Sequence, residues 1–128
     1  MSYQDLTNNQ GGKMSVRRYA SKKLEAAKSL GSSFVTDATD LKFVDNIGYL
    51  IICSSVTGNT GIFTAQVKIG DSDWSDLTFS TPAQIANSDI TFEINLNQVP
   101  YEKIRLSFAD SAGDGVVDIY VSGKGLGG

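Results

Sequence analysis

The second half of the chain alternates apolar and polar residues in four successive segments. These segments span residues 61–69, 90–96, 101–109 and 115–122. Successive side chains of a β-strand point to opposite faces of the sheet, so each segment presents one apolar face and one polar face. The acidic residues of this region fall almost entirely on polar steps or in turns. The pattern predicts antiparallel strands that bury one face in a common core.

One further segment, residues 47–54, is apolar on both of its faces. Its alternate positions are Tyr49, Ile51 and Cys53 on one face and Leu50 and Ile52 on the other. A strand of this kind is typical of the middle of a sheet that is covered on both sides. We therefore expect the second face to be covered by an N-terminal helix or by a neighbouring subunit.

These segments, with shorter ones at 33–36 and 77–79, give about seven to eight strands separated by turn residues. The fold class they predict is all-β, an antiparallel β-sandwich of the jelly-roll kind. The glycine-containing turn at 57–61 is expected to join 47–54 and 61–69 as a hairpin.

Residues 15–30 carry apolar side chains at helical spacing. The positions are Val16, Tyr19, Ala20, Leu24, Ala27 and Leu30. With Ser15 as a cap and Gly31 after the last apolar residue, the spacing favours a helix, and the alternative is an extended arm that leads into the sheet. The expected organisation is a basic, partly helical arm at 1–31, whose first thirteen residues are mobile, a sandwich domain at 32–124 and a flexible glycine-rich tail at 125–128.

Charge is distributed unevenly along the chain, whose net charge is −3. Residues 1–28 contain six Lys and Arg against two Asp and Glu, whereas the remainder contains five against twelve. A basic arm can bind nucleic acid or an acidic neighbouring subunit, and the interspersed apolar residues favour protein docking. The predicted partner-binding residues of the arm are Arg17, Arg18, Tyr19, Lys22 and Lys23.

Length and composition restrict the remaining classes of protein. A chain of 128 residues with 41% hydrophobic and 20% charged residues fits a single folded domain. No apolar run approaches the ~20 residues of a membrane-spanning helix, and the first residues do not resemble a secretion signal, so we expect a cytoplasmic origin. Histidine is absent, and the single cysteine, Cys53, lies in an apolar run where it is expected to act as a buried hydrophobe. No catalytic or cofactor-binding constellation is predicted.

Three aspartates in the turn at 70–76 partly match a calcium-binding loop. The turn lacks the glycine and the distal glutamate of that loop, so no metal site is expected. The favoured interpretation is that Asp71 and Asp73 shape the turn while Trp74 caps the edge of the core. Asp110 and Asp114 are likewise typical of a tight turn, and a glycosidase-like pair of carboxylates ranks as the weakest hypothesis.

The segments 65–77, 95–106 and 111–124 carry a resemblance to a known class of protein. They contain an acidic turn before Trp74, a Leu-Asn-Gln-Val-Pro-Tyr corner at 96–101, an Ile-Arg-Leu strand at 104–106 and a closing glycine-rich hairpin. This succession resembles small β-sandwich structural proteins of tailed bacteriophage virions. In the commoner form of the acidic turn a glycine follows the aspartate, whereas Ser72 and Asp73 stand here.

The resemblance implies a non-enzymatic virion component, such as a head decoration or auxiliary capsid protein or a neck or tail part. It implies assembly in the host cytoplasm, localisation in the virion, and contacts with further copies of itself and with other virion proteins. The expected contact elements are the arm, the turn near Trp74 and the edge strands. A cofactor is not implied.

Two alternatives stay open. A carbohydrate-binding or host-attachment module can present Trp74, Tyr101 or Tyr120 to a glycan, with Tyr120 on the outward side of its strand. A small coat protein can instead touch its genome through the basic arm, with a salt-sensitive association. Neither alternative involves a membrane.

Overall fold

The computed structural model describes residues 17–42, 44–79, 81–97 and 99–126, and these residues contain strands and connections but no helix. The strands are β1 (Arg17–Ser29), β2 (Phe34–Val35), β3 (Thr39–Asp40), β4 (Asn46–Thr57), β5 (Ile62–Lys68), β6 (Ser75–Asp76), β7 (Ala83–Gln84), β8 (Ile90–Leu96), β9 (Lys103–Ala109) and β10 (Asp114–Leu126). In this part of the chain no helix is long and apolar enough to span a membrane.

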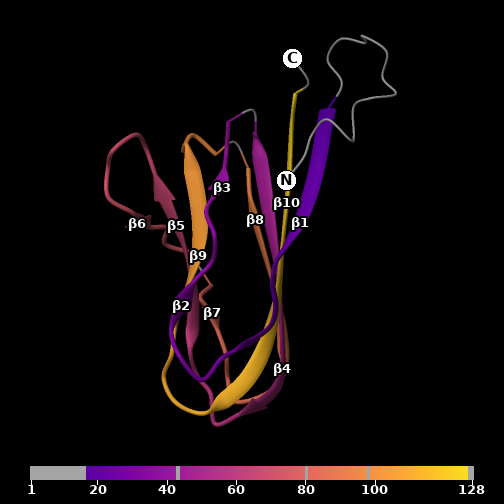
Figure 1. The fold of residues 1–128 in the computed structure, drawn as a ribbon, viewed down its shortest axis with the longest axis vertical. Coiled ribbons are helices and arrows are strands. Elements are labelled where there is room, and N and C mark those ends of the chain that lie inside the picture. Colours follow the sequence, from indigo (N-terminus) through magenta and orange to yellow (C-terminus); the bar gives the residue numbers. More distant parts are fainter. Residues whose placement is uncertain (1–16, 43, 80, 98, 127–128) are drawn as a thin grey trace.

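The strands form two antiparallel sheets that pack together as a β-sandwich (Figure 1). Sheet A has the order β1-β10-β4-β8. Sheet B has the order β2-β9-β5-β6, with β3 also paired to β9 and β7 also paired to β5. The predicted all-β antiparallel sandwich is confirmed. The described residues form ten strands rather than seven to eight, because four short strands of two residues each flank β9 and β5.

The hairpin predicted between residues 47–54 and 61–69 is wrong. β4 pairs with β10 and β8 in sheet A, whereas β5 pairs with β9 in sheet B, so the connection crosses from one layer to the other. Gly58 supports the turn with a positive φ of 64°. Asn59 is fully buried in the connection, where its side-chain nitrogen donates to the Leu30 carbonyl (2.9 Å) and its side-chain oxygen accepts from the Gly61 amide (2.8 Å). This buried amide holds the crossing in place.

The core lies between the two sheets, where buried and partly exposed side chains alternate along the long strands. Phe63 and Phe108 of sheet B lie with ring centroids 4.7 Å apart, and Ile51 of sheet A is fully buried. A buried side chain of this size contributes ~1.5–3 kcal/mol to folding. Ile69, which the alternation predicts to face inward, is 55% exposed because β5 ends at Lys68.

β1 takes the place of the helix predicted for residues 15–30, and that prediction is wrong for the described part of the segment. The strand pairs antiparallel with β10, and its register shifts between Lys23 and Glu25 and again between Glu25 and Lys28. A bulge inserts an extra residue and changes which side chains face the core. Apolar residues before and after a bulge then fall at uneven intervals, which resemble helical spacing. The extended alternative is the correct one here.

β10 also continues further than the alternation indicates. Gly125 and Leu126, the first two residues of the predicted flexible tail at 125–128, pair with β1. The rest of that tail at 127–128, and the segment 1–13 that was expected to be mobile, lie outside the described residues. In the described part, the basic arm is therefore an edge strand of the sandwich.

Candidate functional site on the outer face of sheet A

The outer face of sheet A carries apolar side chains that no described element covers. Leu50 and Ile52 project outward from the centre of β4 and are half-buried, and Tyr120 on the neighbouring β10 is 37% exposed. The strand register places Lys23, Tyr120, Leu50 and Glu93 in one row across β1, β10, β4 and β8. Residues 17–29, predicted as part of the helical cover, form β1 at the edge of this sheet instead, and a neighbouring subunit is the other cover that the sequence analysis predicts.

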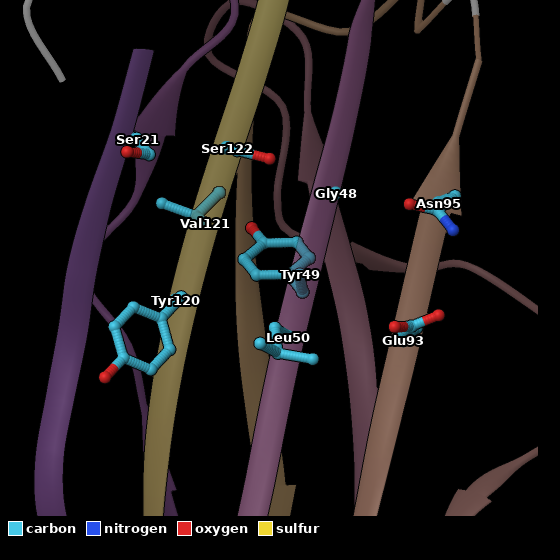
Figure 2. Close-up of a pocket in the computed structure, with 9 residues that line it drawn as sticks. All are labelled: Ser21, Gly48, Tyr49, Leu50, Glu93, Asn95, Tyr120, Val121 and Ser122. Atoms are coloured by element: carbon cyan, nitrogen blue, oxygen red, sulfur yellow. The ribbon is translucent and has the colours of Figure 1, made fainter.

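A shallow groove of about 390 Å³ crosses this face (Figure 2). Its centre is Gly48 on β4, which lies between Ser122 of β10 and Asn95 of β8. A Cβ atom at Gly48 would lie 3.0 Å from the Asn95 side-chain oxygen and 3.7 Å from the Ser122 hydroxyl. The missing side chain therefore opens the groove. A second hollow of about 310 Å³ shares these three residues and continues toward Asn46 and Lys124.

The groove offers mainly uncharged polar groups. Ser21, Ser122 and Asn95 contribute hydroxyl and amide groups, and Glu93 contributes the carboxylate among its lining residues. Tyr49 also borders the groove through β4, but its side chain is buried, and burial raises the pKa of its hydroxyl well above the ordinary value. Such a surface can exchange hydrogen bonds with a polar ligand or with a protein.

Lys23 connects the arm strand to this face. Its ammonium lies 5.2 Å from the centroid of the Tyr120 ring and 3.8 Å from the Asp118 carboxylate, which also accepts a hydrogen bond from the Ala27 amide. The ion pair is about 40% exposed, and pairs in that setting contribute ~0–1 kcal/mol. These contacts therefore position the irregular part of β1 on β10, and their contribution to the free energy of folding is small.

The other predicted residues of the arm are not gathered at one site. Lys22 is exposed, but it neighbours Lys23 along a strand, so the two side chains leave opposite faces of sheet A. Arg17, Arg18 and Tyr19 lie in β1 opposite Leu126, Gly125 and Lys124, and their side chains lie outside the described part. The partner-binding role of these residues remains a prediction.

Trp74 lies on the opposite side of the molecule, on the outer face of sheet B. The Arg105 guanidinium stacks 4.2 Å from its ring centroid, and the Lys68 ammonium lies 5.8 Å from it. Arg105 donates to Gln66 (2.8 Å), which donates in turn to Asp76 (2.8 Å). Trp74 therefore covers outward-facing polar side chains rather than the edge of the core. It directly precedes β6, whose pairing with β5 brings it to this face.

The acidic turns form no metal cluster among the described residues, where no group of three or more His, Cys, Asp or Glu could hold an ion. In the turn at 70–76 the Ser72 hydroxyl accepts from the Ile69 amide (3.0 Å), and the Ser72 amide donates to the Ile69 carbonyl (3.0 Å). The Gly70 amide donates to Glu102. Side-chain capping of this kind is typical of a structural turn.

Cys53 and Tyr101 are both less exposed than Tyr120. Cys53 is buried, and burial together with the nearby Asp89 carboxylate raises the pKa of its thiol to about 11. The thiolate is the nucleophilic form, so this cysteine is inert at neutral pH. Tyr101 is partly buried against the core, which leaves Tyr120 as the more accessible of the two tyrosines predicted for glycan binding.

The sequence analysis did not identify Gly48, Asn95 and Ser122, although they form the centre of the groove. They lie on three strands that are far apart along the chain, and only the strand order brings them together. A glycine within an otherwise apolar strand is the one available signal, because such glycines often mark a close approach of a ligand or backbone.

Solved structures share this fold at low sequence identity. The SPBc2 prophage-derived protein YomS matches with a TM-score of 0.57 and 10% identity, over 86% of this chain and 97% of YomS. A structure of the infectious bursal disease virus Gx strain matches with a TM-score of 0.62 and 13% identity, over 90% of this chain and 33% of that chain. The VP2 subviral particle of the same virus matches with a TM-score of 0.57 and 14% identity, over 91% of this chain and 34% of that chain.

The chain thus spans nearly all of YomS but about a third of each infectious bursal disease virus chain. At these identities the comparison establishes a common fold. No protein-family model and no curated protein matches the sequence.

Proposed function

We propose that this protein is a non-enzymatic structural component of a virion that acts through contacts between subunits. The strand order supports this proposal. If β2 with β3, and β6 with β7, are each counted as one interrupted strand, the described residues form eight strands in two sheets of four. Nearly every connection between them crosses from one sheet to the other, as in the jelly-roll sandwiches of viral capsids. A prophage-derived protein and viral particle proteins share the fold.

The observation that carries the proposal is the open outer face of sheet A. A central strand with apolar side chains on both faces needs cover on both, and Leu50 and Ile52 have none within the described chain. A subunit that packs on this face would bury them together with Tyr120. A stable contact of this kind covers ~800 Å² on each partner.

The finer role that we favour is that of a head decoration or auxiliary capsid protein, or a head–tail component, of a tailed bacteriophage. A small rigid sandwich with an edge strand rich in cations suits such a role, because the arm can contact a neighbouring subunit without altering the core. Its partners would be further copies of the chain and other virion proteins, in a particle assembled in the host cytoplasm.

Substitution of Leu50 by lysine tests this function. Size-exclusion chromatography with light scattering would measure the self-association of the wild type, of Leu50→Lys and of the control Thr64→Lys, which adds the same charge to the outer face of sheet B. We expect Leu50→Lys to weaken association by at least about tenfold, since a buried lysine loses its hydration. Thr64→Lys should associate like the wild type.

A wild-type chain that stays monomeric at every concentration, and that is absent from purified particles, contradicts the proposal. Equal association of both variants would instead remove the outer face of sheet A from the contact. Thermal unfolding of each variant separates a lost contact from a lost fold.

The groove around Gly48 favours a second candidate, a glycan-binding surface for host attachment. Amide, hydroxyl and carboxylate groups beside an exposed tyrosine suit the hydroxyls and the apolar face of a sugar ring. Gly48→Ala should fill the groove and abolish binding on a glycan array, whereas Trp74→Ala should leave it unchanged. Loss of binding in Trp74→Ala alone would move the site to sheet B.

A further inference from the structure

The two edges of sheet A differ in how well they are protected from pairing with another strand. β1 carries the exposed Lys22 and Lys23 and two register shifts, and charges and bulges of this kind block further pairing. β8, at the other edge, pairs with β4 without a register shift along all seven of its residues. It contains no lysine and no proline.

The backbone groups on the free side of β8 are also not paired with another described strand. Within the described residues, the backbone groups of β8 make no hydrogen bond outside its pairing with β4. A groove of about 430 Å³ lies beside this edge, between β8 and the residues Thr78, Phe79, Thr81, Pro82 and Ala83. Phe79 and Phe92 line it, so the flank of the sandwich is recessed and partly apolar at the position where another strand would lie.

The sequence of β8 is complementary to itself in an antiparallel pairing. Inward and outward side chains match only when the two paired residue numbers have the same parity. Pairing about Glu93 would place two carboxylates opposite each other, which is unfavourable. Pairing about Ile94 instead places Glu93 opposite Asn95, and Phe92 opposite Leu96. This arrangement also covers all four residues that β8 contributes to the groove, Phe92, Glu93, Ile94 and Asn95.

We propose that two copies of the chain pair antiparallel through β8, with Ile94 opposite Ile94 of the partner subunit. The two four-stranded sheets then form one continuous sheet across a two-fold axis, and the contact is isologous. The inference rests on the proposed assembly of copies and specifies where two of them meet. It leaves the outer face of sheet A free for contacts with other subunits.

Disulfide trapping tests both the contact and its register. Residues opposite each other in an antiparallel pair have Cα atoms ~4.5–5.5 Å apart, which a disulfide can bridge. In the proposed register the double variant Glu93→Cys/Asn95→Cys aligns each new cysteine with the other one on the partner subunit. Glu93→Cys or Asn95→Cys alone aligns a cysteine with a residue that cannot react. Both positions are exposed, and the native Cys53 is buried.

We expect the double variant to oxidise almost completely to a reducible dimer, while both single variants stay monomeric on a non-reducing gel. Cross-linking of Glu93→Cys alone would identify pairing about Glu93, and cross-linking of Thr91→Cys/Glu93→Cys but not of the original pair would identify pairing about Phe92. Either result overturns the register. Oligomers in light scattering without any of these cross-links would overturn the β8 contact and keep the proposed function. A strict monomer would overturn the β8 contact, and a strict monomer that is also absent from purified particles would overturn both.

Discussion

Replacement of Asn59 by alanine should destabilise the fold more than any exposed amide substitution. The Asn59 side chain is fully buried and makes two hydrogen bonds to backbone groups, the Leu30 carbonyl and the Gly61 amide. Alanine removes the side-chain amide that makes both bonds, and so leaves the Leu30 carbonyl and the Gly61 amide without these hydrogen bonds. Each unsatisfied group costs ~1–3 kcal/mol. The expected loss of unfolding free energy is therefore ~2–6 kcal/mol, a large share of the ~5–15 kcal/mol typical of one domain.

Urea denaturation followed by circular dichroism measures this loss as a lower midpoint with an unchanged slope. In a thermal scan a loss of this size corresponds to a decrease in Tm of roughly 7–20 °C. The matched control is Asn97→Ala, because Asn97 is exposed, and its stability should stay within ~0.5 kcal/mol of the wild type. A loss below ~1 kcal/mol for Asn59→Ala would refute the view that this amide fixes the crossing between the sheets.

Three further outcomes are expected. Gly113→Ala should lower the free energy of unfolding, measured by urea denaturation, by on the order of 2 kcal/mol or more, since φ is 82° and a Cβ would clash with the Thr57 carbonyl oxygen. Gly70→Ala is the control: its φ is also positive but no atom lies near the Cβ, so it should cost only ~1 kcal/mol. Equal losses in the two variants would contradict the clash. Arg105→Ala should shift the emission of Trp74, the single tryptophan, to longer wavelength and cost ~1 kcal/mol, and an unchanged spectrum would argue against the stacking. Cys53 should react with a thiol reagent at pH 8 only as fast as the protein unfolds locally, because the pKa of its thiol is about 11 in the fold and lower in the unfolded chain. Rapid labelling of the native protein would contradict this burial. The same pKa difference predicts that the free energy of unfolding decreases as the pH rises above the pKa of the unfolded chain.

The alternation of apolar and polar residues predicted the strands better than their partners. Residues 90–96 form a strand with those bounds, and β5 and β9 differ from the predicted segments by at most two residues at an end. Period-two alternation is a local property, so one sequence window suffices to detect it. Pairing is a property of the whole chain. The turn after β4 has the composition of a hairpin turn, yet the buried Asn59 anchors it as a crossing between layers.

The error at β1 has a different physical origin. Its two register shifts break the alternation that would identify a strand, and the result is a helix-like spacing of Ala20, Leu24 and Leu30. The free edge of β10 decides the outcome, because an edge strand satisfies backbone groups that a helix would leave open. A bulge cannot be recognised from one sequence without knowledge of the neighbouring strand.

Features of the candidate site that depend on the alternation within a single strand could be predicted from the sequence. Features that depend on which strands lie side by side could not. The outward position of Tyr120, and the apolar second face with Leu50 and Ile52, follow from the alternation of single strands. The groove requires Gly48, Asn95 and Ser122 to be adjacent, which depends on the order of three strands. The position of Trp74 depends on β6, a strand of two residues that no local pattern marks.

The two outer faces of the sandwich differ in a way that bears on assembly. On sheet B, Arg105 donates to Gln66, Gln66 donates to Asp76, and Trp74 stacks on Arg105, so these polar groups on the outer face are bonded to one another. Sheet A instead combines half-buried aliphatic side chains at its centre with an unprotected edge at β8. Apolar surface and an open strand edge are both unfavourable in water, and a second subunit on sheet A relieves both. This difference is the reason that we propose contacts through sheet A rather than sheet B.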